Sequence, residues 1–184
     1  MKQPGGRKTT GIAINFEIMC KVIRHLPVYT GMNDYRNRII SLLESVERPG
    51  MGNVIRFLNE STYFDAPCCR HHRFQGGLAA HSLEVYDVMK GTNPLLNGDS
   101  VIIASLLHDV CKARHHKGGN IEGHGKRSVR LLTEVCGLEL TKDEYNAILN
   151  HMHPFAKGAK HSALGAALVL GDNVSAAFGA KERA

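Results

Sequence analysis

The residues best suited to chemistry in this sequence are histidines and aspartates scattered through apolar segments. The chain has 184 residues, of which 11 are histidines, and most of these lie between His71 and His161. Neutral imidazole and carboxylate groups together bind Zn, Mn, Fe, Co or Ni better than Ca. A histidine-rich tract can also be an exposed surface, so the positions of these residues within the predicted helices decide between the two interpretations.

Two predicted helices place such side chains on a buried face. In Leu78–Met89, His81 lies at helical spacing from the leucine and valine of the apolar stripe, and therefore points inward. The segment Ser100–Cys111 is apolar nearly all round, which indicates a central buried helix, and His108 and Asp109 lie near its end. An unpaired buried carboxylate is costly, so Asp109 requires a cation or strong donors nearby.

Three further candidates come from later segments. Asp172 lies four residues after a core leucine in the predicted helix His161–Phe178, and His151 follows a core isoleucine by three. His124 occupies a glycine-flanked corner before the next helix. His153 competes with His151, but a proline follows it directly, which favours His151. These six candidate ligands suit either one metal ion or two ions roughly 3.5–4 Å apart, and their spacing fits both.

The order of these residues resembles the HD-domain metal-dependent phosphohydrolase superfamily. The resemblance covers about residues 61–178, and His124 and His151 match the additional ligands of members with two metals. The stretch from His71 to His81 is similar to the HD modules of 3′→5′ exoribonucleases and relaxase-type proteins. Such exonucleases usually carry a preceding OB-fold domain, for which this helical N-terminal part is too short. The motifs that carry the resemblance are Gly76-Gly77-Leu78, His81-Ser82-Leu83, Leu106-Leu107-His108-Asp109-Val110-Cys111-Lys112 and the distant Asp172.

The resemblance implies an activity and a ligand set, and the chemistry and position of other residues suggest further roles. The expected enzyme is a phosphomonoesterase or phosphodiesterase that uses metal-bound hydroxide on a phosphoester of a nucleotide or oligonucleotide. Asp109 would also orient the attacking water or accept its proton, and Lys112 would contact a phosphate oxygen. His72 and Arg73 would line the entrance for the substrate. The ligand set implied for a first ion is His81, His108, Asp109 and Asp172, with His124 and His151 on a second ion where one is present.

Two other functions remain open from the sequence. Some two-metal HD proteins have a similar ligand set but use a di-iron centre for oxidative cleavage, and no residue in this sequence discriminates against that chemistry. A non-catalytic module that binds nucleotides or nucleic acid is disfavoured because every ligand position is retained. Salt-sensitive binding to RNA or DNA would be its expected property.

The apolar segments have helical rather than alternating periodicity, which predicts an all-α fold. We expect a compact multi-helix HD-type bundle whose central buried helix ends in His108-Asp109. Residues 1–10 are expected to be a flexible tail, and residues 11–184 a single domain. Thr141 followed by Glu144 predicts a capping box. The predicted helices are Ile12–Leu26, Asp34–Val46, Asn53–Asn59, Leu78–Met89, Ser100–Cys111, Gly125–Cys136, Thr141–Met152 and His161–Phe178.

Composition narrows the protein class further. No apolar run approaches the ~20 residues of a membrane-spanning helix, so no membrane partner is expected. The polar, glycine-rich start Met1 to Thr10 differs from an export signal. Five cysteines without a CxxC pair predict reduced thiols and a cytoplasmic location. The net charge of +6 suits an anionic substrate and is compatible with nucleic acid, although a solvated basic surface is the simpler interpretation.

Overall fold

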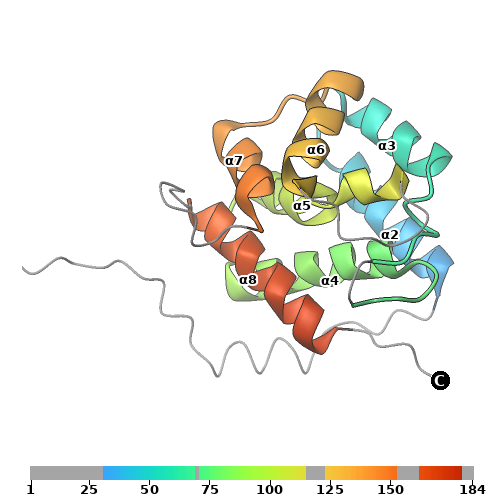
Figure 1. Ribbon diagram of the computed structural model, residues 1–184. Helices are drawn as coiled ribbons and strands as arrows, with labels where there is room; N and C mark the ends of the chain where they lie inside the picture. The colour runs from blue at the N-terminus through green and yellow to red at the C-terminus, as the bar shows by residue number, and fades with distance from the viewer. Residues whose placement is uncertain (1–30, 69–70, 115–122, 153–161, 180–184) are drawn as a thin grey trace, which may run out of the picture.

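A computed structural model describes residues 31–68, 71–114, 123–152 and 162–179. Within these residues the chain forms seven α-helices and two short helical segments, with no strand, which confirms the all-α prediction. The predicted helix Ile12–Leu26 and the predicted tail 1–10 lie outside the described residues. No described helix has both the length and the apolar character needed to span a membrane. The α-helices are α2 (Met32–Glu44), α3 (Met51–Glu60), α4 (Gly77–Thr92), α5 (Gly98–Leu107), α6 (His124–Arg130), α7 (Lys142–Asn150) and α8 (Ala163–Phe178) (Figure 1).

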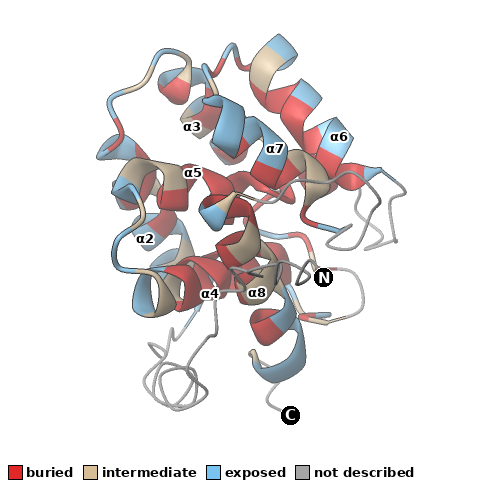
Figure 2. Ribbon diagram, turned by 90° about the vertical axis from the view of Figure 1, so that its left-hand side faces the viewer, coloured by how far each residue is buried: buried red, intermediate tan, exposed pale blue. Residues whose placement is uncertain are grey.

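Helix α5 is the central helix of the bundle, as predicted. Every residue from Val101 to Leu107 is buried, and α5 packs against α4, α7 and α8. A helix that is apolar all round must be covered on every side, which explains its central place. It starts where the Asn97 side chain accepts a hydrogen bond from the Ser100 amide at 3.0 Å. The long buried stretches of α4 and α5 stand out in Figure 2.

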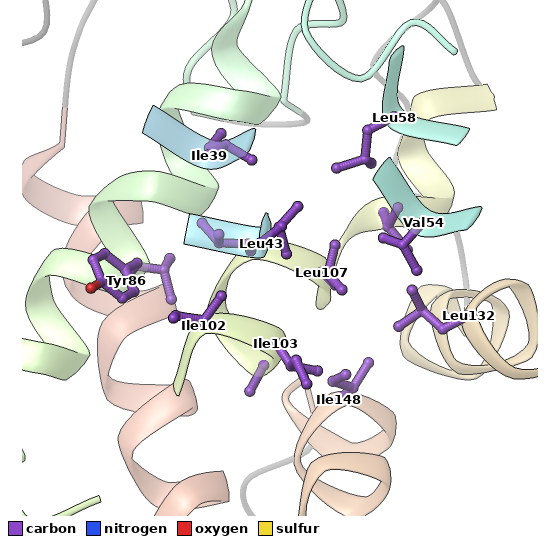
Figure 3. Packing of buried hydrophobic residues seen from close by; sticks show 14 of the residues in the cluster. Ile39, Leu43, Val54, Leu58, Tyr86, Ile102, Ile103, Leu107, Leu132 and Ile148 are labelled. Atoms are coloured by element: carbon purple, nitrogen blue, oxygen red, sulfur yellow. The ribbon is translucent and has the colours of Figure 1, made fainter. Parts of the chain in front are cut away.

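One hydrophobic core joins the helices before and after α5. Figure 3 shows side chains of α2, α3, α5 and α7 meeting around this helix. Leu43, Val54, Leu107, Leu132 and Ile148 are all fully buried there. Burying a side chain of this size stabilises a fold by roughly 1.5–3 kcal/mol. The core therefore holds the ends of α5 and α7 in fixed positions.

Helices α4 and α8 form the other wall of the bundle. Helix α8 lies across α4 (Figure 1), and both helices also contact α5. Almost every residue of α4 from Gly77 to Met89 is buried. Polar side chains on the facing sides of α4 and α8 are therefore removed from water and must find partners inside the bundle.

The predicted helix Ser100–Cys111 is wrong at its C-terminal end. Helix α5 ends at Leu107, and a short 3₁₀ helix, η1 (Val110–Arg114), follows a turn. In this turn the Lys112 amide donates to the Asp109 carbonyl at 2.9 Å, three residues back rather than four. Side chains three residues apart eclipse in 3₁₀ geometry. The tighter turn therefore brings the Asp109 and Lys112 side chains together.

The end of the predicted helix Gly125–Cys136 also differs from a regular α-helix. Helix α6 ends at Arg130 and continues as a π-helical turn, η2 (Leu131–Val135). The Cys136 amide donates to the Leu131 carbonyl at 3.0 Å, five residues back. Side-chain periodicity carries no signal for this change, because the apolar positions continue through it.

The capping box at the start of α7 is confirmed. The Thr141 hydroxyl accepts from the Glu144 amide at 3.2 Å, and the Glu144 carboxylate accepts from the Thr141 amide at 2.8 Å. Glu144 is fully buried and also accepts from Arg48 and Ser100, each at 2.7 Å. This single carboxylate ties α7 to the start of α5 and to the loop before α3.

Candidate metal centre

The structure brings the six predicted ligands to one place inside the bundle. They come from α4, the turn after α5, the first residue of α6, the end of α7 and the middle of α8. Five of them, all except Asp172, are at most 5% exposed. The Asp172 side chain is 15% exposed and is the most accessible of the set. The alternative ligand His153 lies outside the described residues.

One half of the cluster joins α4, α5 and α8. His81 Nε2 lies 3.1 Å from Asp172 Oδ1, and the His81 and His108 ring centroids are 5.3 Å apart. One ligand atom from each of His81, His108 and Asp172 lies within 4.8 Å of the other two. Three donors from three helices therefore surround a common point.

The other half is arranged around Asp109. Asp109 Oδ1 lies 3.3 Å from His124 Nε2 and 3.6 Å from His151 Nε2. The two Nε2 atoms are 3.0 Å apart, and Asp109 Oδ2 lies 3.6 Å from His108 Nε2. Donors that share one ion at ~2.1 Å lie roughly 3.0–3.4 Å from one another. The pairs His81–Asp172, His124–His151 and His124–Asp109 fall in this range, and one Asp109 oxygen faces each half.

Helices α5 and α7 end in the same way, with a histidine at the C-cap. His108 donates its Nδ1 hydrogen to the Ser105 carbonyl at 2.8 Å, and His151 donates to the Ile148 carbonyl at 2.7 Å. Each ring hydrogen-bonds a carbonyl near the end of its helix, where regular intrahelical partners run out. In the neutral ring, this fixes the proton on Nδ1 and leaves an electron pair on Nε2, which faces the cluster. The partial negative charge of two helix ends also favours a cation there.

Burial and neighbouring charges set the protonation of the cluster. Burial lowers the pKa of His108 to about 3, so this ring is neutral near pH 7. Burial alone would raise the pKa of the Asp109 carboxyl, but Lys112, His108 and His151 hold it well below its usual range. Burial alone would raise the pKa of Asp172, but the neighbouring His81 and His108 rings together hold it below its usual range. Burial favours neutral His151, but the Asp109 carboxylate raises its pKa above the ordinary value.

Three buried atoms of the cluster that could bind a metal ion have no hydrogen-bond partner among the described residues. They are the Nε2 atoms of His81 and His108 and the Oδ1 atom of Asp109. Leaving such atoms unsatisfied is costly, and native proteins rarely do so without a bound water or ion. Two carboxylates with neutral imidazoles form the donor set that divalent transition metals prefer. The residues therefore fit a metal ion.

A comparison with protein families matches residues 78–177, more than half of the chain, to the HD domain. The chain belongs to the HD domain family. The HD domain defines a superfamily of metal-dependent phosphohydrolases. No curated protein and no solved structure matches the chain. The matched region runs from α4 to α8 and contains all six ligand candidates, whereas His71 and His72 lie before it.

Lys112 lies inside the HD domain rather than at its surface. Its ammonium contacts Asp109 Oδ2, and the residue is 8% exposed. The predicted helix Ser100–Cys111 stopped directly before this lysine, whereas Lys112 forms part of the 3₁₀ helix η1. Lys112 therefore compensates the charge of Asp109 directly, at the edge of the cluster.

The two residues predicted to line the substrate entrance differ in exposure. Arg73 is exposed, but the His72 side chain is 1% exposed and donates from Nε2 to the Glu84 carboxylate at 2.9 Å. His72 Nδ1 lies 2.9 Å from His71 Nδ1. Both ring nitrogens of His72 are thus engaged, which argues against a direct substrate contact. The prediction expected an accessible loop residue and did not account for a carboxylate beneath it on α4.

Sequence reasoning missed His71 and Ser175, which contact the ligand candidate His81, and also Glu84, which contacts Ser175. The His71 ring lies 4.5 Å from the His81 ring between centroids, and burial lowers its pKa to about 4. Glu84 and Ser175 follow two of the ligands, His81 and Asp172, by three residues on the same helix. That spacing places each pair on one face and was the available signal. His71 is in a loop, where no periodicity marks it.

Proposed function

We propose that this HD domain hydrolyses a phosphoester of a nucleotide or oligonucleotide with one or two divalent transition-metal ions (Mn, Fe, Zn, Co or Ni). The observation that carries the proposal is the group of three buried, unsatisfied donor atoms within a histidine–aspartate cluster. Membership of the HD family supports the reaction class. The phosphoester, the nucleotide and the choice between monoester and diester are parts of the proposal.

Two ions fit the two halves of the cluster better than one. His81, His108 and Asp172 with Asp109 Oδ2 would hold the first ion, and Asp109 Oδ1 with His124 and His151 would hold the second. The support is that different oxygens of Asp109 face the two halves. Divalent ions supply Lewis acidity in such sites, lowering the pKa of coordinated water and offsetting charge on the phosphoryl group.

The protein residues have separate tasks in this proposal. Asp109, ionised and anchored beside Lys112, orients the attacking water or accepts its proton. The Lys112 ammonium is the candidate contact for a phosphoryl oxygen, because it lies beside the cluster and carries a positive charge. The exposed Arg73 is the candidate contact for a more distant phosphate of the substrate.

The net positive charge of the chain supports an anionic substrate. The chain carries a net charge of +6, which favours anionic partners, and nucleic acid remains a candidate substrate. Cys68, Cys111 and Cys136 form no disulfide among the described residues. This fits the cytoplasmic location proposed from the sequence.

The test is hydrolysis by metal-depleted and metal-reloaded protein. The substrates are p-nitrophenyl phosphate, bis-p-nitrophenyl phosphate, nucleoside monophosphates and short RNA and DNA oligomers. We expect chelation to lower turnover by roughly 100-fold or more and Mn²⁺ or Co²⁺ to restore it. Full turnover after complete metal removal would contradict the proposal. Oxygen uptake with iron would instead favour the di-iron oxygenase, and metal loading without any turnover would favour a binding module.

A further inference from the structure

Behind His81, on the side opposite Asp172, a chain of hydrogen bonds links α4 to α8. His81 Nδ1 lies 3.0 Å from Ser175 Oγ, and that hydroxyl donates to Glu84 Oε2 at 2.7 Å. A serine hydroxyl has one hydrogen, and here it is given to the carboxylate. Ser175 Oγ must therefore accept the hydrogen on His81 Nδ1. The proton is fixed on Nδ1, and the electron pair of Nε2 faces the cluster.

A second branch ends on the same oxygen atom. Glu84 Oε2 also accepts from His72 Nε2 at 2.9 Å. When His72 is neutral, its Nδ1 accepts the hydrogen of His71 Nδ1, which lies 2.9 Å away. His71 then presents Nε2 as an acceptor from a half-buried position beside the His81 ring. Glu84 Oε2 thus orients His81 by way of Ser175 and His71 by way of His72.

The backbone around Glu84 is shaped to hold this arrangement. Glu84, Ser175 and His72 are all buried. A Cβ atom at Gly179, which follows α8, would lie 2.0 Å from Glu84 Oε2 and 2.5 Å from the Ser175 carbonyl oxygen, so a larger residue would displace the carboxylate or the chain that covers it. His72 has a φ of 51°, an uncommon conformation for a residue with a side chain. Backbone strain of this kind persists only where the surroundings hold it in place.

We propose that Glu84 is a positioning residue of the metal centre, acting on His81 through Ser175 and on His71 through His72. This role rests on the proposed function, since it concerns the ligand site of that reaction. Metal-bound histidines commonly donate their other ring hydrogen to such a partner, which fixes the tautomer and raises ligand basicity. His71 then offers a hydrogen-bond acceptor to a substrate at the partly exposed edge of the centre.

The first arm of the test uses the metal-free full chain. Two-bond ¹⁵N–¹H spectra of the histidine rings, assigned with His81→Asn, are expected to show His81 with its proton on Nδ1. Ser175→Ala removes the acceptor and should shift the ring toward the Nε2 tautomer or a mixture. Ser82→Ala, which also removes a buried hydroxyl from the bundle, should leave the His81 signals unchanged. A wild-type ring protonated on Nε2, or a Ser175→Ala spectrum identical to wild type, overturns the proposal.

The second arm titrates the same proteins with Co²⁺ and follows the visible absorption of the complex. We expect Ser175→Ala and Glu84→Ala to weaken Co²⁺ binding by roughly 10–100-fold, with Ser82→Ala unchanged. Glu84→Gln retains an oxygen acceptor and should lose less affinity than Glu84→Ala. A wild-type chain that binds no Co²⁺ overturns the proposed function and this role together. Equally tight binding by wild type and Ser175→Ala overturns this role alone.

Discussion

Replacing Asp109 by asparagine is expected to lower metal-dependent hydrolysis by roughly 100–1,000-fold or more and to abolish binding of at least one ion. Both carboxylate oxygens are committed to the centre: Oδ1 lies near His124 and His151, and Oδ2 lies near His108 and Lys112. An amide of the same shape offers one oxygen and turns two N–H hydrogens toward one of these groups. The measurements are metal content by mass spectrometry and the rate with Mn²⁺.

Asp143→Asn is the matched control for this substitution. Asp143 is an exposed acid in the first turn of α7, so its loss should change neither metal content nor rate. Comparable melting temperatures of the two variants would establish that the bundle remains folded. If Asp109→Asn kept the metal content and the rate of wild type, the cluster would not be the reactive centre.

Of the substitutions proposed for this protein, Gly77→Ala is expected to destabilise the fold most, lowering the free energy of unfolding by about 3 kcal/mol or more. A Cβ atom at Gly77 would lie 1.9 Å from the His72 carbonyl oxygen, far inside contact distance. That carbonyl is held by the Cys68 amide at 3.0 Å, and the Gly77 amide donates to the Phe74 carbonyl at 3.0 Å. Relief therefore requires the loop to leave α4, which would also displace His71 and His72. Urea denaturation measures the free energy of unfolding.

Gly52→Ala provides the contrast. Gly52 is in α3, and no atom of the described residues lies within 4 Å of its Cβ position. Alanine there should stabilise the protein by roughly 0.5–1 kcal/mol, because it restricts the unfolded chain and favours the helix. A Gly77→Ala protein as stable as Gly52→Ala would show that the loop before α4 is not held where the structure places it.

The helical fold and the convergence of the ligand candidates follow from periodicity. His81 lies on a strongly apolar helix, and His108 follows a segment with no polar face, so both had to point inward. Such patterns report which face of a helix is buried. They do not report how a helix ends. At the early end of α5 the His108 ring hydrogen-bonds to the Ser105 carbonyl, a contact that the apolar pattern does not encode.

The surroundings of the ligands were harder to predict for a different reason. Glu84 and Ser175 are 91 residues apart and meet only because α8 lies across α4. His72 looked like a loop residue at an entrance, yet its ring enters the interior to reach the Glu84 carboxylate. Contacts of this kind depend on the packing angle of two helices and on one backbone conformation. Neither has a local sequence signal.

Anomalous diffraction from crystals grown with Mn²⁺ would test the central claim most directly. We expect a peak between the helices with His81 Nε2, His108 Nε2 and carboxylate oxygens of Asp109 and Asp172 at roughly 2.0–2.3 Å from it. A second peak should lie near His124 and His151, on the Oδ1 side of Asp109. Well-ordered crystals at millimolar Mn²⁺ with no anomalous density among these side chains would contradict the assignment of this cluster as a metal centre.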